Sequence, residues 1–562
     1  MKTTTALAGA ACAALLGALG SAPAQAASDQ KQQSVEVLQD TVINLLQALV
    51  QRGVITQQQA EQMVKQAQDK ANADLAAERA KERAQQEQEE KEGAIAVPYV
   101  PKIIQQKIEK QVAAQVQPAV TSNVLKEAKK EGWGVPGALP DWIRKVRVGG
   151  DITLRSQLDL YGNNGAVCPA GTPYGNCTIL NFNAVNAAGG IEQAGTSAYL
   201  NVNQDNERFR ARARLGVEVD LTSSFDAGIR LATGSLDTPN SETQTFGSEF
   251  GRYTVGFDRI YIRWRGRTSR GFPYLTAIGG KFADPFFAPT QLVYADILDF
   301  DGAAITGRVG YGDGSAEQSN VFLTVGGFPI QEVPLVAQND KWMVGGQIGT
   351  ALRFGDDQRL KIAGAYYDFI HMQGIPNVEF STLTNYTAPL FVTHGNTMCN
   401  ISGDPTGETQ LFALCSQYRI ADIAAGYILP VGRYSFSFDA EGARNLGYKV
   451  GQIADRFAGI EVPEARVDGY VGDLAFGDPQ VFQAWQWRAT LGYRYVQRDA
   501  VLDALTDPDF HEGGTDAQGY FLHGDLGLAD NVWTRLSYFS GRQIDGPTYA
   551  VDVIQLDLNA RF

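Results

Sequence analysis

Arginine is the residue type most clearly arranged in a pattern that could carry chemistry. In the segment ERFRARARLGVEVDL, residues 207–221, arginines occupy every second position from Arg208 to Arg214. Neighbouring segments add more, and the full set is Arg155, Arg208, Arg210, Arg212, Arg214, Arg230, Arg259, Arg263 and Arg265. Arginine stays charged, donates through a rigid fork and is less strongly hydrated than lysine. From Val146 onward only Lys281, Lys341, Lys361 and Lys449 are lysines. This bias suits charges held in a defined lining better than charges on a soluble surface.

Histidine, in contrast, forms no catalytic pattern. The chain has only His371, His394, His511 and His523, and the first three fall in expected loops without a GxSxG or HExxH context. An enzyme anchored in a membrane would also need a serine and histidine pair that we cannot place. We therefore expect no enzymatic activity, no cofactor and no metal site.

The cysteines suggest covalent cross-links. Apart from Cys12, they form two local pairs, Cys168 with Cys177 and Cys399 with Cys415, each inside a segment rich in Gly, Pro, Asn or Thr. An even number in an exported chain favours two disulfides that staple loops. Free thiols and a four-thiolate metal site are the alternatives, and the lack of Cys-x-x-Cys spacing disfavours the metal.

Length and hydropathy limit the class of protein. The chain has 562 residues, which allows three or four soluble domains or one large barrel with an appendage. Its mean hydropathy is −0.19, and only the extreme N-terminus approaches the ~20 apolar residues that a spanning helix needs. Residues 1–26 combine Lys2, an Ala/Leu/Gly core and Ala24-Gln25-Ala26, which predicts a secretory signal peptide. A helical membrane protein is therefore excluded, and Cys12 would leave with the signal.

The pattern of residues 27–131 predicts helices. Val35, Leu38, Val42, Leu45 and Leu49 recur at three- and four-residue steps, which places them on one helix face. A nearly all-polar stretch, AERAKERAQQEQEEKE, follows; we favour a solvated single helix or spacer there over a regular coiled coil. Residues 132–145, rich in Pro, Gly and Trp, form a stiff linker. The region would be a coiled-coil-like periplasmic tether or assembly stalk.

From residue 146 the hydrophobic period changes from 3.6 to 2. In residues 207–221, Phe209, Leu215 and Val217 share one face of a strand and the arginines share the other. With the segments that open at 148 and 207, about sixteen such strands are expected, the others at 225–234, 257–266, 274–283, 300–309, 320–329, 342–354, 359–370, 418–429, 433–445, 468–477, 482–497, 517–529, 532–542 and 550–562.

The connections between these strands alternate between short and long. Tight turns such as 222–224 and 355–358 contrast with excursions such as 162–206 and 371–417. Short turns on one side and long loops on the other are typical of an outer-membrane barrel with an even number of strands. The fold class is therefore an all-β transmembrane barrel over 146–562, preceded by the periplasmic helical region.

Specific segments strengthen this interpretation. The last strand, YAVDVIQLDLNARF, ends the chain on Phe562, and a terminal aromatic of this kind resembles the insertion signal that the barrel-assembly machinery reads. The stretch YRYVQRDAVLDALTDPDFHEGGTDAQGYFLHGDLGLADNVWTRLSYFSGRQIDG, with GDITLR, GGKFADPF and LDFDGAAITG, resembles the "putative porin" family of Gram-negative outer-membrane proteins. The resemblance implies a sixteen-stranded pore in outer-membrane lipid, as a homotrimer. The long cysteine-bearing loops depart from the family pattern.

In porins the third loop commonly folds into the lumen. Here that loop, ADPFFAPTQLVYADILDF, brings Asp284, Asp296 and Asp299, with Asp301 just after it. Facing the arginine wall, these carboxylates would create a transverse field that orients polar solutes at a constriction. The arginines could equally pair with carboxylates such as Glu218 and Asp220 to hold the barrel rigid, and paired arginines could do both.

The expected function is passive diffusion of small hydrophilic solutes and ions through a water-filled channel. A channel specific for sugars or anions fits the strand pattern equally well. The alternative from another class is an envelope tether whose N-terminal helices bind peptidoglycan or mediate oligomerisation. No nucleic-acid partner is expected.

Overall fold

A computed structural model describes residues 145–162, 179–312, 314–315, 317–334, 339–355, 357–457 and 459–562. The expected signal peptide (1–26), helical region (27–131) and all but the last residue of the linker (132–145) lie outside these residues, as do Cys168 and Cys177. Within the described part, no helix is both long enough and apolar enough to cross a membrane.

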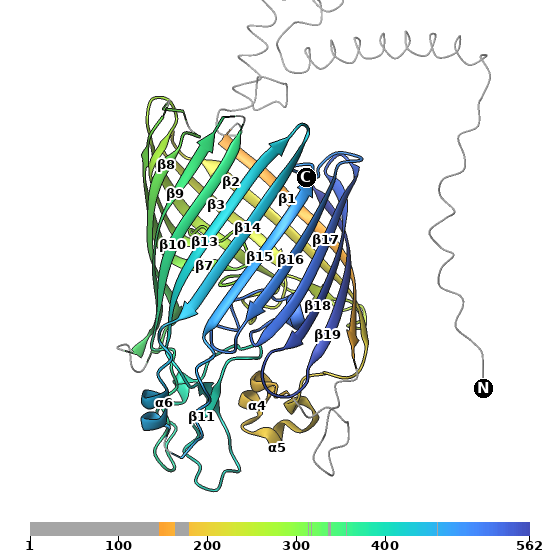
Figure 1. Ribbon diagram of the computed structural model, residues 1–562. Helices are drawn as coiled ribbons and strands as arrows, with labels where there is room; N and C mark the ends of the chain where they lie inside the picture. Colours follow the sequence, from red (N-terminus) through yellow and green to blue (C-terminus); the bar gives the residue numbers. More distant parts are fainter. Residues whose placement is uncertain are drawn as a thin grey trace, which may run out of the picture. The chain divides into compact units, whose positions relative to one another are not determined.

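Sixteen long antiparallel strands of the described chain form one closed barrel (Figure 1). They are β1 (Val146–Tyr161), β2 (Asn206–Asp220), β3 (Phe225–Thr233), β5 (Val255–Arg267), β6 (Pro273–Ala283), β7 (Asp299–Gly310), β8 (Asn320–Gln331), β9 (Lys341–Phe354), β10 (Gln358–Ile370), β13 (Tyr418–Val431), β14 (Tyr434–Asn445), β15 (Asp468–Gly477), β16 (Trp487–Val496), β17 (Ala517–Ala529), β18 (Val532–Gln543) and β19 (Ala550–Arg561). Each pairs with the next along the chain, and β1 also pairs with β19. The expected strand number is confirmed.

Small elements decorate the long loops. They are β4 (Gln244–Thr245), the hairpin of β11 (Met398–Asn400) and β12 (Phe412–Leu414), helices α4 (Phe182–Ala188), α5 (Ile191–Ala194) and α6 (Val450–Arg456), and 3₁₀ turns at Gly195–Ala198, Asn385–Thr387 and Phe510–Glu512. Helices α4, α5 and α6 gather at the barrel end opposite the C-terminus (Figure 1). We call this end the loop end and the other the turn end.

The period of two in the sequence separates the two faces of the barrel wall. On β2, Phe209 and Leu215 are exposed on the outer face, while Arg212 and Arg214 on the other face pair with Asp151 of β1. Strands alternate in this way because successive side chains point to opposite sides of a sheet. The apolar face can therefore meet lipid while the charged face meets the lumen.

One predicted strand is shorter than expected. The pattern predicts a strand over 482–497, but β16 begins at Trp487. The side chain of Gln486 accepts hydrogen bonds from the backbone N–H groups of Phe482 and Gln483, both at 2.8 Å. These bonds close a turn, so the backbone of 482–486 is not free to join the sheet.

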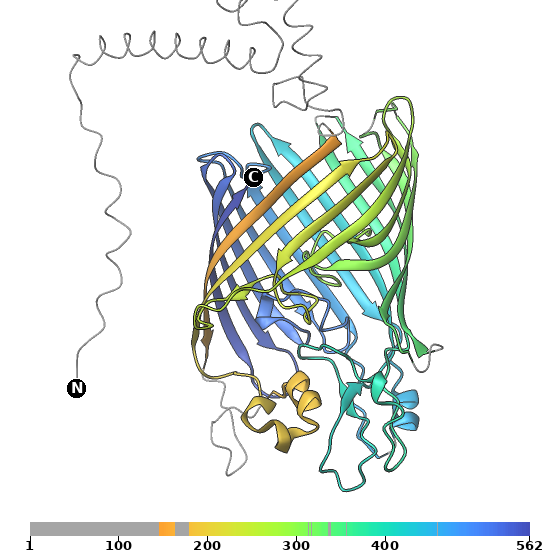
Figure 2. The same cartoon turned by 180° about the vertical axis from the view of Figure 1, so that it is seen from behind.

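Part of the lumen is filled by two inward-folded loops, L3 (residues 284–298) and L7 (residues 497–516), and Figure 2 shows loop segments inside the barrel. Their apolar side chains form an interior cluster with residues of the wall. Its members include Leu292, Val293 and Tyr294 of L3, Val501 and Leu502 of L7, and Phe328, Tyr367, Tyr418 and Val471 of the strands. Each fully buried side chain of this size contributes about 1.5–3 kcal/mol. The lumen thus contains a hydrophobic core of its own.

The chain terminus closes the barrel against a glycine. Phe562 and Gly150 exchange two backbone hydrogen bonds of 3.0 Å. A Cβ at Gly150 would lie 2.7 Å from the Phe562 ring and 2.3 Å from the carbonyl oxygen of Arg214. The ring therefore rests where any side chain at position 150 would stand.

We predict that Gly150→Ala destabilises the closure of β1 onto β19, because the added methyl overlaps both backbone and ring; overpacking of this kind costs about 1–3 kcal/mol. The measurement is the temperature at which the folded band converts to the unfolded band in electrophoresis. Gly149→Ala is the matched control, since its Cβ would come no closer than 3.4 Å to another atom. Equal conversion temperatures for the two variants would contradict this account.

Candidate functional site

L3 crosses the lumen and is fastened to the wall on its far side. The Phe287 N–H donates to Oε1 of Gln347 on β9 at 2.7 Å, and the Thr290 hydroxyl donates to Glu441 on β14 at 2.6 Å. L7 holds the same loop from the other direction, because the Thr506 hydroxyl donates to the Leu292 carbonyl at 2.7 Å. These bonds fix L3 as a partition across the barrel.

An open cavity of about 610 Å³ remains beside this partition. Strands β1 and β2 form one wall of it, and Arg155, Arg208, Arg210 and Arg212 line that wall. The rest is contributed by residues 181–201 of the first long loop, by loop L2 (residues 234–254), by L3, by L7, by residues 391–394 of loop L5 (residues 371–417), by Arg535 of β18 and by Tyr549. Four of the nine predicted arginines therefore line one side of the cavity, and loops form most of the other sides.

Eight of the nine predicted arginines are held by carboxylates. Arg155 pairs with Asp509 and Asp557; Arg208 with Asp159 and Glu512; Arg212 and Arg214 with Asp151 and Glu242; Arg230 with Glu242, Asp258 and Asp299; Arg259 with Asp299; and Arg263 and Arg265 with Asp226. Carboxylates bridge neighbouring guanidinium groups, so the wall is a mixed lattice of charge and not a purely basic surface.

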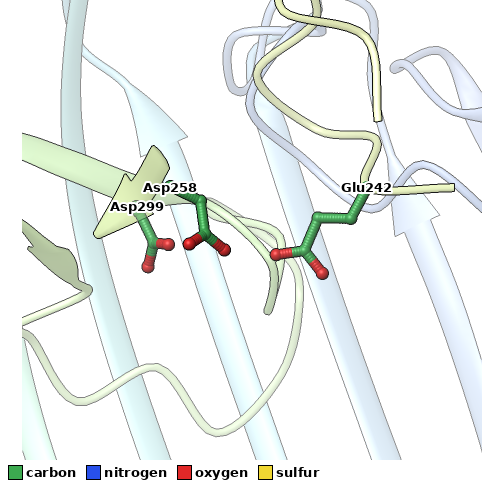
Figure 3. Close-up of side chains that lie close together, drawn as sticks. All are labelled: Glu242, Asp258 and Asp299. Carbon is green, nitrogen blue, oxygen red and sulfur yellow. The ribbon is translucent and has the colours of Figure 1, made fainter. Parts of the chain in front are cut away.

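Arg230 is the centre of the densest part of this lattice. Figure 3 shows Glu242, Asp258 and Asp299 brought together from separate segments, with one carboxylate oxygen of each within 4.8 Å of the others. Three carboxylates at such distances could hold a metal ion. Nη2 of Arg230, however, lies 3.2, 2.5 and 3.0 Å from the three groups, so the guanidinium already supplies the positive charge that they require.

Arg210 differs from its neighbours on β2. Among the described residues no carboxylate lies within ion-pair distance of it, and its contacts are Gln157 Oε1 and Ser241 Oγ, both at 3.4 Å. Its Nε is buried and has no hydrogen-bond partner among these residues, a feature that it shares with Arg208 and Arg212. The alternating sequence treats the four arginines of β2 alike, and only their surroundings distinguish this one.

The four predicted acidic residues occupy different environments. Asp296 lies on L3 and lines the cavity, and Asp299 pairs with Arg230 and Arg259. The Asp284 carboxylate accepts the Phe286 N–H at 2.8 Å, and burial raises the pKa of Asp284 to about 7. Asp301 is 57% exposed and pairs with Lys281 of β6 at 2.9 Å. Of the four, only Asp296 lines the cavity, and only Asp299 forms ion pairs with predicted arginines.

Two histidines form a contact between L5 and L7 that the sequence does not reveal. Nε2 of His394 lies 3.4 Å from Nδ1 of His511, and Nε2 of His511 lies 3.2 Å from the Tyr549 carbonyl. A carbonyl only accepts, so His511 carries its proton on Nε2 and receives the His394 N–H on Nδ1. Burial lowers the pKa of His394 to about 4 and that of His511 to about 3. Both rings are neutral in this arrangement.

Three further predicted features lie in the described chain: one cysteine pair, His523 and Phe562. Cys399 and Cys415 form a disulfide, which confirms one of the two expected pairs and lies at the β11–β12 hairpin of L5. Nδ1 of His523 is 2.9 Å from the Ser537 hydroxyl, but Ser537 is only 3% exposed, so this pair offers no accessible nucleophile. Phe562 lies at the turn end against Gly150, and its role in assembly stays a prediction.

Comparison with known proteins identifies the family. A family model described as "putative porin" matches residues 39–562, and no curated protein matches the chain. Among solved structures, OprB of Pseudomonas putida is 10% identical, with 77% of this chain and 97% of that chain covered and a TM-score of 0.43. A loop L8 deletion mutant of Vibrio cholerae OmpT is 11% identical, with 74% of this chain and 100% of that chain covered and a TM-score of 0.38. Salmonella typhi OmpF in complex with daunomycin is 9% identical, with 74% of this chain and 97% of that chain covered and a TM-score of 0.38.

We predict that Arg230→Met strongly lowers stability, because three carboxylates would be left close together without their cation. Breaking a buried ion pair by removing one partner costs about 3–5 kcal/mol. The measurement is the midpoint of denaturant unfolding followed by tryptophan fluorescence, with and without Ca²⁺, which should restore part of the loss.

The control for this prediction is Arg147→Met. Arg147 also pairs with two carboxylates, Glu218 and Asp220, but its side chain is 53% exposed, and exposed pairs contribute little to stability. Equal midpoints for Arg230→Met and Arg147→Met would refute the central role of Arg230.

A pH dependence follows from the histidine contact. Since the folded pKa values of His394 and His511 lie below the ordinary value of 6.5, the unfolded loops bind more protons in acid, and stability falls as pH drops from about 6.5 toward 4. We predict faster amide exchange in 392–396, after correction for intrinsic rates, at pH 5 than at pH 7.

The double variant His394→Asn/His511→Asn is the control, and asparagine tolerates the positive φ of 55° at position 511. The control is needed because Asp503 of L7 gives stability the opposite pH dependence. Burial raises the pKa of Asp503 to about 7, so the contribution of this residue to stability is lost as pH rises. An equal pH response in wild type and double variant would rule out the histidines as its source.

Proposed function

The chain belongs to the putative porin family, and we propose that it forms a water-filled channel for small hydrophilic solutes and ions, whose path runs through the cavity between the arginine wall and L3. Family and closed barrel together support an outer-membrane channel protein without enzymatic activity. The observation that carries this proposal is the cavity of about 610 Å³ inside the barrel, whose lining from β1, β2, β18 and six loops is rich in charged and polar side chains.

The size of the barrel supports an aqueous path. Sixteen strands enclose a lumen that wall side chains alone cannot fill. L3 and L7 occupy part of it with the interior cluster, so the remaining cavity, and not the barrel diameter, would set the limit on solute size. The bonds from L3 to Gln347 and Glu441 would keep that limit constant.

The charges of the lining support a preference for polar solutes. Arginines from β1 and β2 face the cavity together with Asp296 of L3. A solute between them would experience a field across its path, and an apolar solute would lose hydration without gaining a partner. Since the ion pairs of Arg155, Arg208 and Arg212 hold those side chains in place, the lining would be rigid as well as polar.

Orientation and assembly complete the proposal. The loop end would face the cell exterior, where the Cys399–Cys415 disulfide is in an oxidising environment, and the turn end would face the periplasm. The homotrimer that the family resemblance implies remains a prediction, as do contacts with the assembly machinery. Binding of peptidoglycan by residues 27–131 concerns a part of the chain outside the described residues.

We predict that the purified protein conducts ions in planar bilayers, with closures in steps of three if it is a trimer. The variant Arg210→Ala/Arg212→Ala should raise the cation-to-anion permeability ratio about two- to threefold, because removed charges act over about 8–10 Å in physiological salt. The measurement is the reversal potential in a salt gradient.

The matched control is Arg433→Ala, which removes a cation that is 63% exposed and pairs with Asp478 at the turn end. An unchanged reversal potential in the double variant would count against the arginine wall as the source of selectivity. Absence of conductance in the wild type would overturn the channel itself.

A further inference from the structure

The inner wall formed by β6 to β10 differs in charge from the arginine wall of β1 and β2. Strands β6, β8 and β9 contain no Asp or Glu. The carboxylates of β7 and β10 all lie near the loop end, where β7 begins and β10 ends. Each of them belongs to another cation: Asp299 pairs with Arg230 and Arg259, Asp301 with Lys281, and Asp368 with Arg419. The turn half of these five strands therefore carries no carboxylate.

Two cations face the lumen from this turn half, Arg308 of β7 and Lys361 of β10. Successive side chains of a strand point to opposite sides of the sheet. Arg308 therefore shares the inner side of its strand with Ala304, and Lys361 shares that of β10 with Tyr367; both of those residues belong to the interior cluster. Both cations are only half-buried, so each remains accessible to small solutes in the lumen.

The contacts of these two cations are neutral. Nη1 of Arg308 donates to the Thr276 hydroxyl at 3.2 Å. Nζ of Lys361 lies 4.1 Å from the centre of the Phe287 ring of L3 and 5.0 Å from that of Phe322 on β8, and Phe322 is the direct partner of Arg308 across the sheet. Aromatic faces attract a cation without cancelling its charge. Among the described residues no carboxylate acts on either cation, and the charge that acts on Lys361 is Arg308.

Asp439 of β14 faces the same half of the lumen but interacts with a different cation. In the register of the sheet, Lys361 lies opposite Gly426, and Gly426 lies opposite Asp439. A Cβ at Gly426 would meet Asp439 Oδ1 at 2.8 Å and the Phe287 ring at 3.2 Å, so the ring occupies the space beside this carboxylate. The charge that acts on Asp439 is Arg488 of β16. Within the described chain, the two cations of β7 and β10 thus have no counter-charge.

We propose that the turn half of the β6–β10 wall holds a binding site for small anions such as chloride or acetate, with the Lys361 ammonium as the contact and the Arg308 charge strengthening the attraction. The ammonium has three N–H donors, and its contacts in the described chain are the two aromatic rings. The inference rests on the proposed channel function and adds a second group of charges to the pore. Carboxylates balance most of the arginine wall, whereas these two cations are left to draw anions into the turn half.

The test measures chloride binding to the purified full chain in a non-ionic detergent, by the line width of the chloride-35 nuclear magnetic resonance signal. Chloride that exchanges with a binding site relaxes faster, so the line broadens with the bound fraction. The wild type should broaden the line, and acetate should reverse the broadening by competing for the site. This measurement does not require the protein to conduct.

Two variants remove the charges one at a time. Lys361→Gln and Arg308→Gln should each weaken chloride binding about two- to fivefold, the effect of one partly exposed charge contact. The matched control is Arg359→Gln, two positions before Lys361 on the same face of β10. Arg359 is 56% exposed and pairs with Glu317 at 3.2 Å, so its removal should reduce the line broadening less than either variant. Electrophoresis of the folded band shows that each variant forms the barrel.

Reversal potentials in planar bilayers separate the site from the channel. Lys361→Gln and Arg308→Gln should both raise the cation-to-anion permeability ratio above that of Arg359→Gln. Equal losses of line broadening in all three variants, or a loss in only one of the first two, would overturn the anion site while a conducting wild type leaves the channel intact. Absence of conductance in a wild type that still binds chloride through Lys361 and Arg308 would overturn the channel and keep the site.

Discussion

The barrel can carry four arginines at alternate positions of one strand because carboxylates from other segments lie between most of them. Asp151 serves both Arg212 and Arg214, and Asp226 serves both Arg263 and Arg265. Like charges on adjacent positions of a sheet face would otherwise repel each other. Pairs between neighbouring strands help to fix the register, and pairs with Glu242 of L2 or Asp509 and Glu512 of L7 hold those loops against the wall. Arginine suits this task because its fork can serve two acceptors at once.

Besides these ion pairs, the structure depends on hydrophobic packing inside the barrel. A sixteen-stranded barrel has a wet interior by default, yet L3 and L7 here carry enough apolar side chains to make a packed core within it. Tyr294 of L3 contacts both Phe300 and Tyr367 edge to face, with ring centroids 5.0 and 5.2 Å apart. The protein therefore has two apolar regions of different kinds, one turned outward to lipid and one turned inward to its own loops. The polar cavity lies beside the inner one.

The sequence predicted the barrel well because a strand between lipid and water must alternate at every position. Strands β15 and β17 begin and end where the pattern placed them, and the local Cys399–Cys415 pair needed only short-range spacing. Contacts between loops could not be predicted in this way. His394 and His511 are 117 positions apart, and no periodicity connects them. Likewise, alternation identified Arg210 as one of four similar residues, while its lack of a carboxylate depends on where L2 and L7 fold. For Asp301, proximity to L3 in sequence suggested a constriction, but its partner is Lys281 on β6.

The seam between β1 and β19 has a consequence for the order of assembly. It joins the first and the last strand of the barrel, so it can form only after every other strand has been synthesised and delivered. The buried residues of the interior cluster lie between positions 261 and 502, before β17, and Phe521 of β17 packs against them. The contacts of L3 with L7 therefore do not require the seam, whereas Phe510 of L7 gains its partners Phe539, Val551 and Val553 only with the last two strands.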